Sequence, residues 1–153
     1  MDKAKILFVY PVPGDLPGEA IDFCEGDLTL HKLPCHVAVF SNGGLLEALP
    51  SGVTISSLDK YADVITKVIT IDVPNLAAAE SWALLQIGRP YSRLSCAEAE
   101  IYALSGEQIN LPQRGSDCSQ LGTDYLRVAG ATLFNSEPAA FIRPSDLLAE
   151  LTK

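Results

Sequence analysis

Short apolar runs separated by turn residues fill the first half of the chain, a pattern that is typical of β-strands. Proline, glycine or an Asn-Gly pair ends most of these runs. The last run, from Val64 to Val73, is rich in β-branched residues, which favour extended backbone. The predicted strands are Lys5–Tyr10, Cys35–Phe40, Leu45–Leu49, Val53–Leu58 and Val64–Val73.

The second half of the chain predicts helices. The segment from Leu76 to Ile87 is rich in Ala, Leu, Glu and Gln, and Pro74 suits its first turn. Three further helices are expected, one from the Ser95 and Glu98 capping box to about Gly106, one from Cys118 to about Gly130, and one after Pro144-Ser145-Asp146. Strands followed by helices predict an α+β fold, with an antiparallel sheet packed against a helical block in a single domain spanning residues 1–153.

Charge and length exclude several classes of partner. The chain has 153 residues and a formal charge of -8, and its lysines and arginines do not cluster, so we expect it to bind neither nucleic acid nor an anionic membrane surface. No stretch approaches the ~20 apolar residues of a membrane span. The N-terminal apolar run is too short for a signal peptide, so the expected location is cytoplasmic, or wherever a phage particle or a secretion machine delivers the protein.

Cys118 is the residue with the clearest chemical potential. The segment Ser116-Asp117-Cys118 places it in the first turn of a predicted helix, where Ser116 or Asp117 can act as the cap. Unpaired N–H groups and the positive end of the helix dipole favour a thiolate there. Spacing along the helix puts Leu121, Tyr125 and Val128 on the same face, so the cysteine is expected to point inward.

A histidine partner follows from the register of the predicted hairpin. If Asn42 and Gly43 form a two-residue turn, Ala38 faces Glu47 on the neighbouring strand. His36 then lies on the same sheet face as Glu47, diagonally next to it, and diagonal side chains of this length can touch. The sequence therefore offers His36 an orienting carboxylate.

Together these residues fit a thiol hydrolase, if the Cys118 helix packs against the sheet face that carries His36 and Glu47. His36 would accept the thiol proton and Glu47 would fix the imidazole and stabilise its charged form. The backbone N–H of Cys118 can bind the developing oxyanion. No cofactor is needed for this chemistry.

Other assignments compete with this one. Cys118 can be a buried structural cysteine, His36 a core histidine, and Glu47 an exposed hairpin carboxylate. Cys96 also starts a predicted helix, but neighbouring carboxylates disfavour its thiolate. A zinc site is disfavoured because its four candidate ligands lack the paired spacing of structural zinc; these are Cys24, His31, Cys35 and His36. We expect the cysteines to be reduced.

The order of these motifs resembles that of the circularly permuted NlpC-type cysteine hydrolases, which belong to the papain-like superfamily. In the permuted group the histidine strand precedes the cysteine helix, as it does here. The matching segments are Gly26-Asp27, His36-Val37-Ala38-Val39, Leu46-Glu47-Ala48, Gly52-Val53, Gly88-Arg89-Pro90-Tyr91-Ser92, Asp117-Cys118-Ser119, Gly130 and Pro144-Ser145-Asp146-Leu147. Two features depart from the family pattern. One is an extra helical segment before Cys118, and the other is the sequence Gln120-Leu121-Gly122 after Ser119.

The resemblance implies a papain-like fold, with Cys118 as the nucleophile, His36 as the base, Glu47 as the third polar residue and the Tyr91 hydroxyl near the oxyanion. It implies cleavage of an amide bond in a small peptide, with bacterial cell-wall peptides as the suggested substrate. A lipid acyl hydrolase or transferase of the same superfamily and a binding module that keeps the fold without turnover stay open as alternatives. The sequence does not define the oligomeric state.

Overall fold

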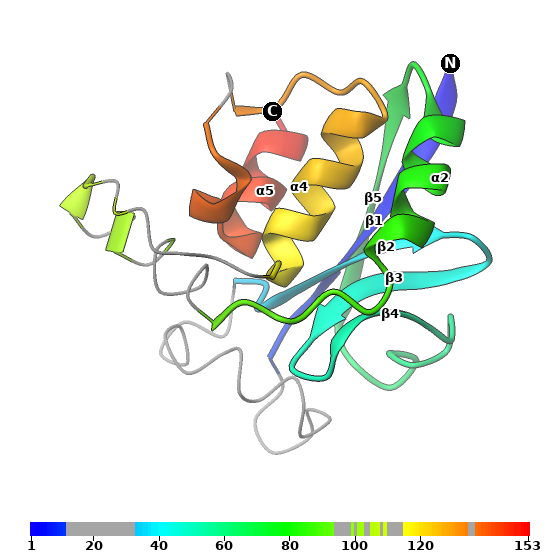
Figure 1. The fold of residues 1–153 in the computed structure, drawn as a ribbon, viewed down its shortest axis with the longest axis horizontal. Helices are drawn as coiled ribbons and strands as arrows, with labels where there is room; N and C mark the ends of the chain where they lie inside the picture. The colour runs from blue at the N-terminus through cyan, green and yellow to red at the C-terminus, as the bar shows by residue number, and fades with distance from the viewer. Residues whose placement is uncertain are drawn as a thin grey trace.

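The computed structural model describes residues 1–11, 33–93, 115–134 and 137–153, together with residues 99, 101, 102, 105–107 and 109. Five strands come first along the described chain, and helices follow them (Figure 1). The elements are β1 (Asp2–Val9), β2 (His36–Ser41), β3 (Gly44–Leu49), β4 (Gly52–Ser56), β5 (Thr66–Val73), α2 (Leu76–Gln86), α4 (Cys118–Val128), a 3₁₀ turn η2 (Ala139–Phe141) and α5 (Pro144–Leu151). The predicted α+β class is confirmed.

The described strands form one sheet in the order β4-β3-β2-β1-β5, and every neighbouring pair is antiparallel. The first strand begins three residues earlier than predicted, because β5 pairs with it along its whole length, from Asp2 opposite Val73 to Val9 opposite Thr66. The sequence pattern does not predict that the first strand pairs with the last. This pairing makes β1 an interior strand, next to β2.

The hairpin between β2 and β3 has the predicted register. Asn42 and Gly43 form the two-residue turn with φ values of 50° and 80°, the left-handed conformations that a type I′ turn requires. Ser41 lies opposite Gly44 and Phe40 opposite Leu45, as predicted for a two-residue turn. This register fixes which side chains of the two strands share a face.

The helices follow their predicted caps with one change. α2 begins after Asn75, whose side chain accepts a hydrogen bond from the Ala78 N–H at 3.0 Å, so Pro74 precedes the cap and does not occupy the first turn. α4 begins at Cys118 with Asp117 as its cap, which settles the choice between Asp117 and Ser116. The helix expected from Ser95 to Gly106 lies mostly outside the described residues.

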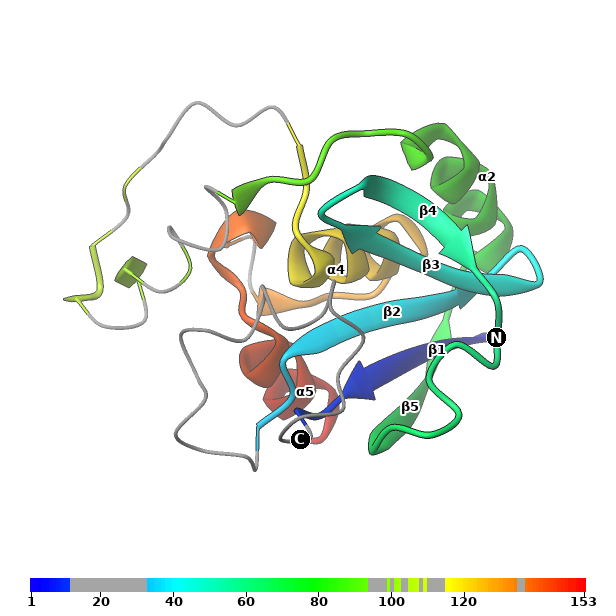
Figure 2. The same cartoon turned by 90° about the horizontal axis from the view of Figure 1, so that it is seen from below.

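The helices α2, α4 and α5 pack against one face of the sheet (Figure 2). α4 covers β2 and β3, and Gly122 allows the close approach, since a Cβ there would lie 3.0 Å from Val37 Cγ1. Leu121 and Tyr125 face the core as predicted, but Val128 is exposed and Ala129 is buried in its place. A straight helix turns by about 100° per residue, so a face extrapolated over ten residues drifts away from the core.

A smaller apolar cluster lies on the other face of the sheet. It consists of Leu7, Val9, Ala38, Leu45 and Tyr61. Tyr61 comes from the connection between β4 and β5 and covers this face. No helix in the described part of the chain is both long enough and apolar enough to cross a membrane.

Candidate active site

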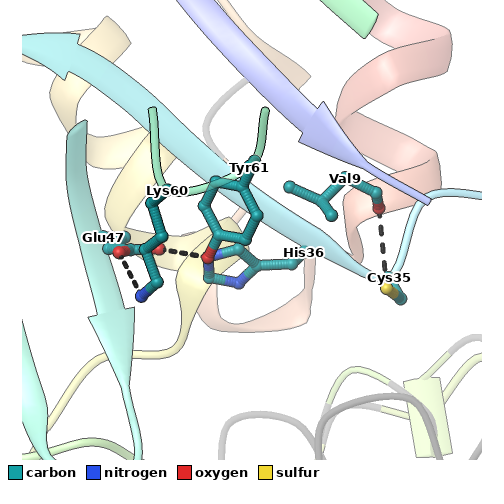
Figure 3. A network of polar contacts seen from close by, with 6 residues as sticks. All are labelled: Val9, Cys35, His36, Glu47, Lys60 and Tyr61. Atoms are coloured by element: carbon teal, nitrogen blue, oxygen red, sulfur yellow. Dashed lines mark hydrogen bonds and ion pairs between the residues drawn. The ribbon is translucent and has the colours of Figure 1, made fainter. Parts of the chain in front are cut away.

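His36 and Glu47 form a buried pair at the end of the sheet where β2 begins (Figure 3). The Nε2 atom of His36 lies 2.8 Å from Oε2 of Glu47, and the side chains are 1% and 0% exposed. The contact crosses the hairpin diagonally, as predicted from the alternation of side chains along paired strands. Glu47 is therefore not the exposed hairpin carboxylate of the competing assignment.

Two residues that the sequence did not single out complete the surroundings of Glu47. The Tyr61 hydroxyl donates to Oε2 at 2.6 Å, and Lys60 Nζ donates to Oε1 at 2.7 Å. Both belong to the connection between β4 and β5. The Tyr61 ring lies 5.9 Å from the His36 ring, so the tyrosine packs beside the pair as well as binding to it. Figure 3 shows Lys60 and Tyr61 converging on Glu47.

Glu47 is ionised in this setting. Burial by itself raises the pKa of the carboxyl, but the hydrogen bond and the charge of His36, with the hydrogen bonds from Lys60 and Ser56, lower the pKa of Glu47 to about 2. Burial and the neighbouring Glu47 carboxylate raise the pKa of Tyr61 above its usual range, so Tyr61 remains a donor. A fixed negative charge therefore sits next to the imidazole.

The Glu47 carboxylate also determines how His36 can act. A carboxylate accepts hydrogen bonds, so the neutral imidazole carries its proton on Nε2 when it contacts Glu47. The basic nitrogen is then Nδ1, and proton exchange with a third group must go through that atom. The arrangement matches a general base whose tautomer is set by a carboxylate.

Cys118 reaches this end of the sheet from the start of α4. Both ribbon views place the beginning of α4 near the beginning of β2, and the two elements run in roughly the same direction (Figures 1 and 2). Gly122 lies over Val37 and Val39, and one helical turn back spans about two strand residues, which brings Cys118 to the level of residues 35 and 36. After burial and the Glu47 carboxylate, which are the larger causes, the charges of Cys118 and Cys35 also raise the pKa of Tyr61.

The relation between the helix and the histidine differs from the expected one. α4 packs on the face that carries Val37 and Val39, whereas His36 and Glu47 alternate to the face that Tyr61 covers. The Cys118 helix therefore does not cover the face of the pair. The packing of Gly122 over Val37 and Val39 instead brings the first residues of α4 to the level of the first residues of β2, at one end of the sheet.

The start of α4 is built around Asp117. Its Oδ1 accepts hydrogen bonds from the Gln120 N–H and the Ser119 hydroxyl, both at 2.8 Å. The side chain is fully buried, and burial raises the pKa of Asp117 to about 7 despite these hydrogen bonds. The cap next to Cys118 is thus a carboxyl that changes its charge near neutral pH.

Tyr91 lies next to the short segment that leads into Cys118. It forms a parallel bridge with Ser116, flanked by hydrogen bonds from the Ser116 N–H to the Pro90 carbonyl at 3.1 Å and from the Ser92 N–H to the Ser116 carbonyl at 3.2 Å. Gly115 makes this approach possible, because a Cβ there would lie 2.1 Å from the Pro90 oxygen. Tyr91 and Cys118 are therefore carried by adjoining segments, and Tyr91 packs at the edge of the main core.

The remaining cysteine and histidine candidates divide into two groups. Cys35 is buried and its thiol lies 3.5 Å from the Val9 carbonyl oxygen, and neither Cys35 nor Cys118 forms a disulfide. The other candidates, Cys24, His31 and Cys96, lie outside the described residues. Within the described ranges no group of three His, Cys, Asp or Glu side chains is arranged to hold a metal ion.

Comparisons with known proteins do not assign the chain to a family. No family model, no curated protein and no solved structure matches it significantly. Its function therefore has to be inferred from the site itself.

Proposed function

We propose that this protein is a cysteine hydrolase that cleaves an amide bond through a thioester on Cys118, in a permuted papain-like fold of the NlpC type. The observation that carries the proposal is the buried hydrogen bond of 2.8 Å between His36 and Glu47, at the end of the sheet where α4 begins with Cys118. Burying a histidine together with a carboxylate costs desolvation free energy, and titratable groups with perturbed pKa values cluster at functional sites. Motif order in the sequence supports the same proposal.

In the proposed reaction, His36 Nδ1 takes the proton from the Cys118 thiol, and the sulfur attacks the carbonyl carbon of the substrate. The oxyanion is bound by the N–H of Cys118 at the helix start, and Tyr91 serves as the second donor. The C–N bond breaks as His36 returns its proton to the leaving amine. Water, deprotonated by His36, then attacks the thioester, which releases the acid and regenerates the thiol.

The proposed substrates are small peptides, and bacterial cell-wall peptides are the first to test. The assay incubates the protein with cell-wall peptide fragments and measures newly released amines by mass spectrometry. The C118A and H36A variants serve as controls. We expect amine release that needs both side chains, with a trapped acyl group on Cys118.

Amine release by C118A at the wild-type rate would contradict the proposal. A Cys118 thiol that is unreactive across the pH range would instead support a binding module that retains the fold without turnover.

A further inference from the structure

The connection between β4 and β5 places two donors on the candidate catalytic pair (Figure 3). Tyr61 is buried against Ala38 and Leu45, and its hydroxyl reaches the carboxylate of Glu47. Lys60 comes from the neighbouring position, and its side chain is 22% exposed. One short loop segment therefore supplies both a buried neutral donor and a charged donor at the edge of the site.

The two donors bind different oxygens of the Glu47 carboxylate. Tyr61 shares Oε2 with His36, at 2.6 and 2.8 Å, while Lys60 holds Oε1 at 2.7 Å. A carboxylate bound at both oxygens cannot rotate about its terminal bond without breaking hydrogen bonds. Its orientation, and with it the direction of the His36 ring, is therefore set by the loop as well as by the two strands.

Lys60 also adds a positive charge to a site that must form a thiolate. A cation near a thiol favours the ionised form, and the part of the charge that faces solvent is screened. Other titratable groups at or near this site include Glu47, Tyr61 and Cys35, and Asp117 with its neighbour Asp124. Lys60 is the lysine that contacts Glu47 directly.

We propose that Lys60 and Tyr61 are positioning residues of the active site, which hold Glu47 ionised and fixed and thereby aim His36 at Cys118. The inference depends on the proposed hydrolase function and adds two residues to its machinery. Neither residue contacts the reacting atoms in this scheme: both act through Glu47, and Lys60 also adds its positive charge to the site. A structural role alone would stabilise the loop without changing the reactivity of the thiol.

The first test compares Y61F with Y125F. Tyr125 is a matched control because it is also a buried tyrosine whose hydroxyl donates to a glutamate, Glu80, at 3.0 Å. The measurement is the rate of Cys118 alkylation by iodoacetamide at about pH 7, mapped by peptide mass spectrometry, alongside the melting temperature. We expect both variants to have a lower melting temperature than the wild type. Only in Y61F should Cys118 react about tenfold more slowly, because that variant loses a group that orients a reacting side chain.

The second test changes the positive charge of the side chain at position 60. K60M removes the cation, K60R keeps it, and K3M removes a lysine whose partner, Asp72, lies on the exposed surface. Lys3 is six residues along β1 from Val9, which pairs with His36, so it lies about 20 Å from the site. We expect K60M to move the acid limb of the alkylation profile upward by about half a pH unit, while K60R and K3M follow the wild type.

These outcomes separate the two proposals. A wild-type Cys118 that does not react in a His36-dependent manner overturns the proposed function. A different result overturns only the positioning role. In that case the wild type reacts as expected, Y61F keeps the wild-type rate and the K60M profile coincides with that of K60R. The proposed hydrolase function would then stand. Asp117 contributes the same step to every profile, so the comparison between variants is unaffected.

Discussion

Replacing Glu47 by glutamine tests the electrostatic design of the buried pair. The substitution keeps the size of the side chain and removes the charge that faces His36, Lys60 and Tyr61. The folded-state pKa of Glu47 is about 2, against an ordinary value of 4.5. A group whose pKa is depressed by folding stabilises the protein above its unfolded pKa, and that stability is lost as the pH falls through the folded value.

The magnitude follows from this difference in pKa. A shift from 4.5 to about 2 corresponds to about 3 kcal/mol of stability at pH 7, and about 1 kcal/mol of it is left at pH 3. The E47Q variant lacks this contribution at every pH. The difference in the free energy of unfolding between wild type and E47Q should therefore shrink by about 2 kcal/mol between pH 7 and pH 3.

The assay is urea denaturation at a series of pH values, followed by the fluorescence of Trp82, the only tryptophan in the chain. D72N is the matched control, because Asp72 also binds a lysine but lies on the exposed surface. Its effect should be small at every pH. A difference between wild type and E47Q that is the same at pH 3 and pH 7 would refute the reasoning, since it would mean that folding does not lower the pKa of Glu47.

Two further substitutions test the surroundings of Cys118. G115A places a Cβ against the Pro90 oxygen and should cost at least about 2 kcal/mol in the free energy of unfolding, measured by urea denaturation; a loss below about 0.5 kcal/mol would show that the Tyr91 segment is not held there. D117N should gain stability relative to the wild type as the pH rises from 4 to 8, by about 4 kcal/mol at most, because burial raises the pKa of Asp117 to about 7 and its ionisation destabilises the folded state. If the difference in the free energy of unfolding between D117N and the wild type does not change with pH, the raised pKa of Asp117 is contradicted.

Local signals in the sequence are sufficient for the elements and for the hairpin. Asn42-Gly43 determines the turn, and the turn determines that His36 meets Glu47, so this part of the site follows from the sequence alone. The cap at Asp117 follows from residue type in the same way. In each case the information lies in residues that are close together along the chain.

The rest depends on contacts between distant segments. The pairing of β1 with β5 joins strands that are far apart along the chain, and no local pattern encodes it. Lys60 and Tyr61 lie in a connection without periodicity, so only the path of the loop over the sheet brings them to Glu47. The expectation that α4 covers the face of His36 is wrong for the same reason, because alternation gives relative faces but not which face a helix covers.

The most direct test of the central claim is the pH profile of Cys118 alkylation in the wild type and in H36A. If His36 activates the thiol, Cys118 should react near neutral pH faster than Cys35, and H36A should lose that advantage and react only as the pH approaches the ordinary thiol range. Mass spectrometry of the alkylated peptides identifies the site. Equal profiles for the wild type and H36A would contradict the claim, because the histidine and the cysteine would then be independent.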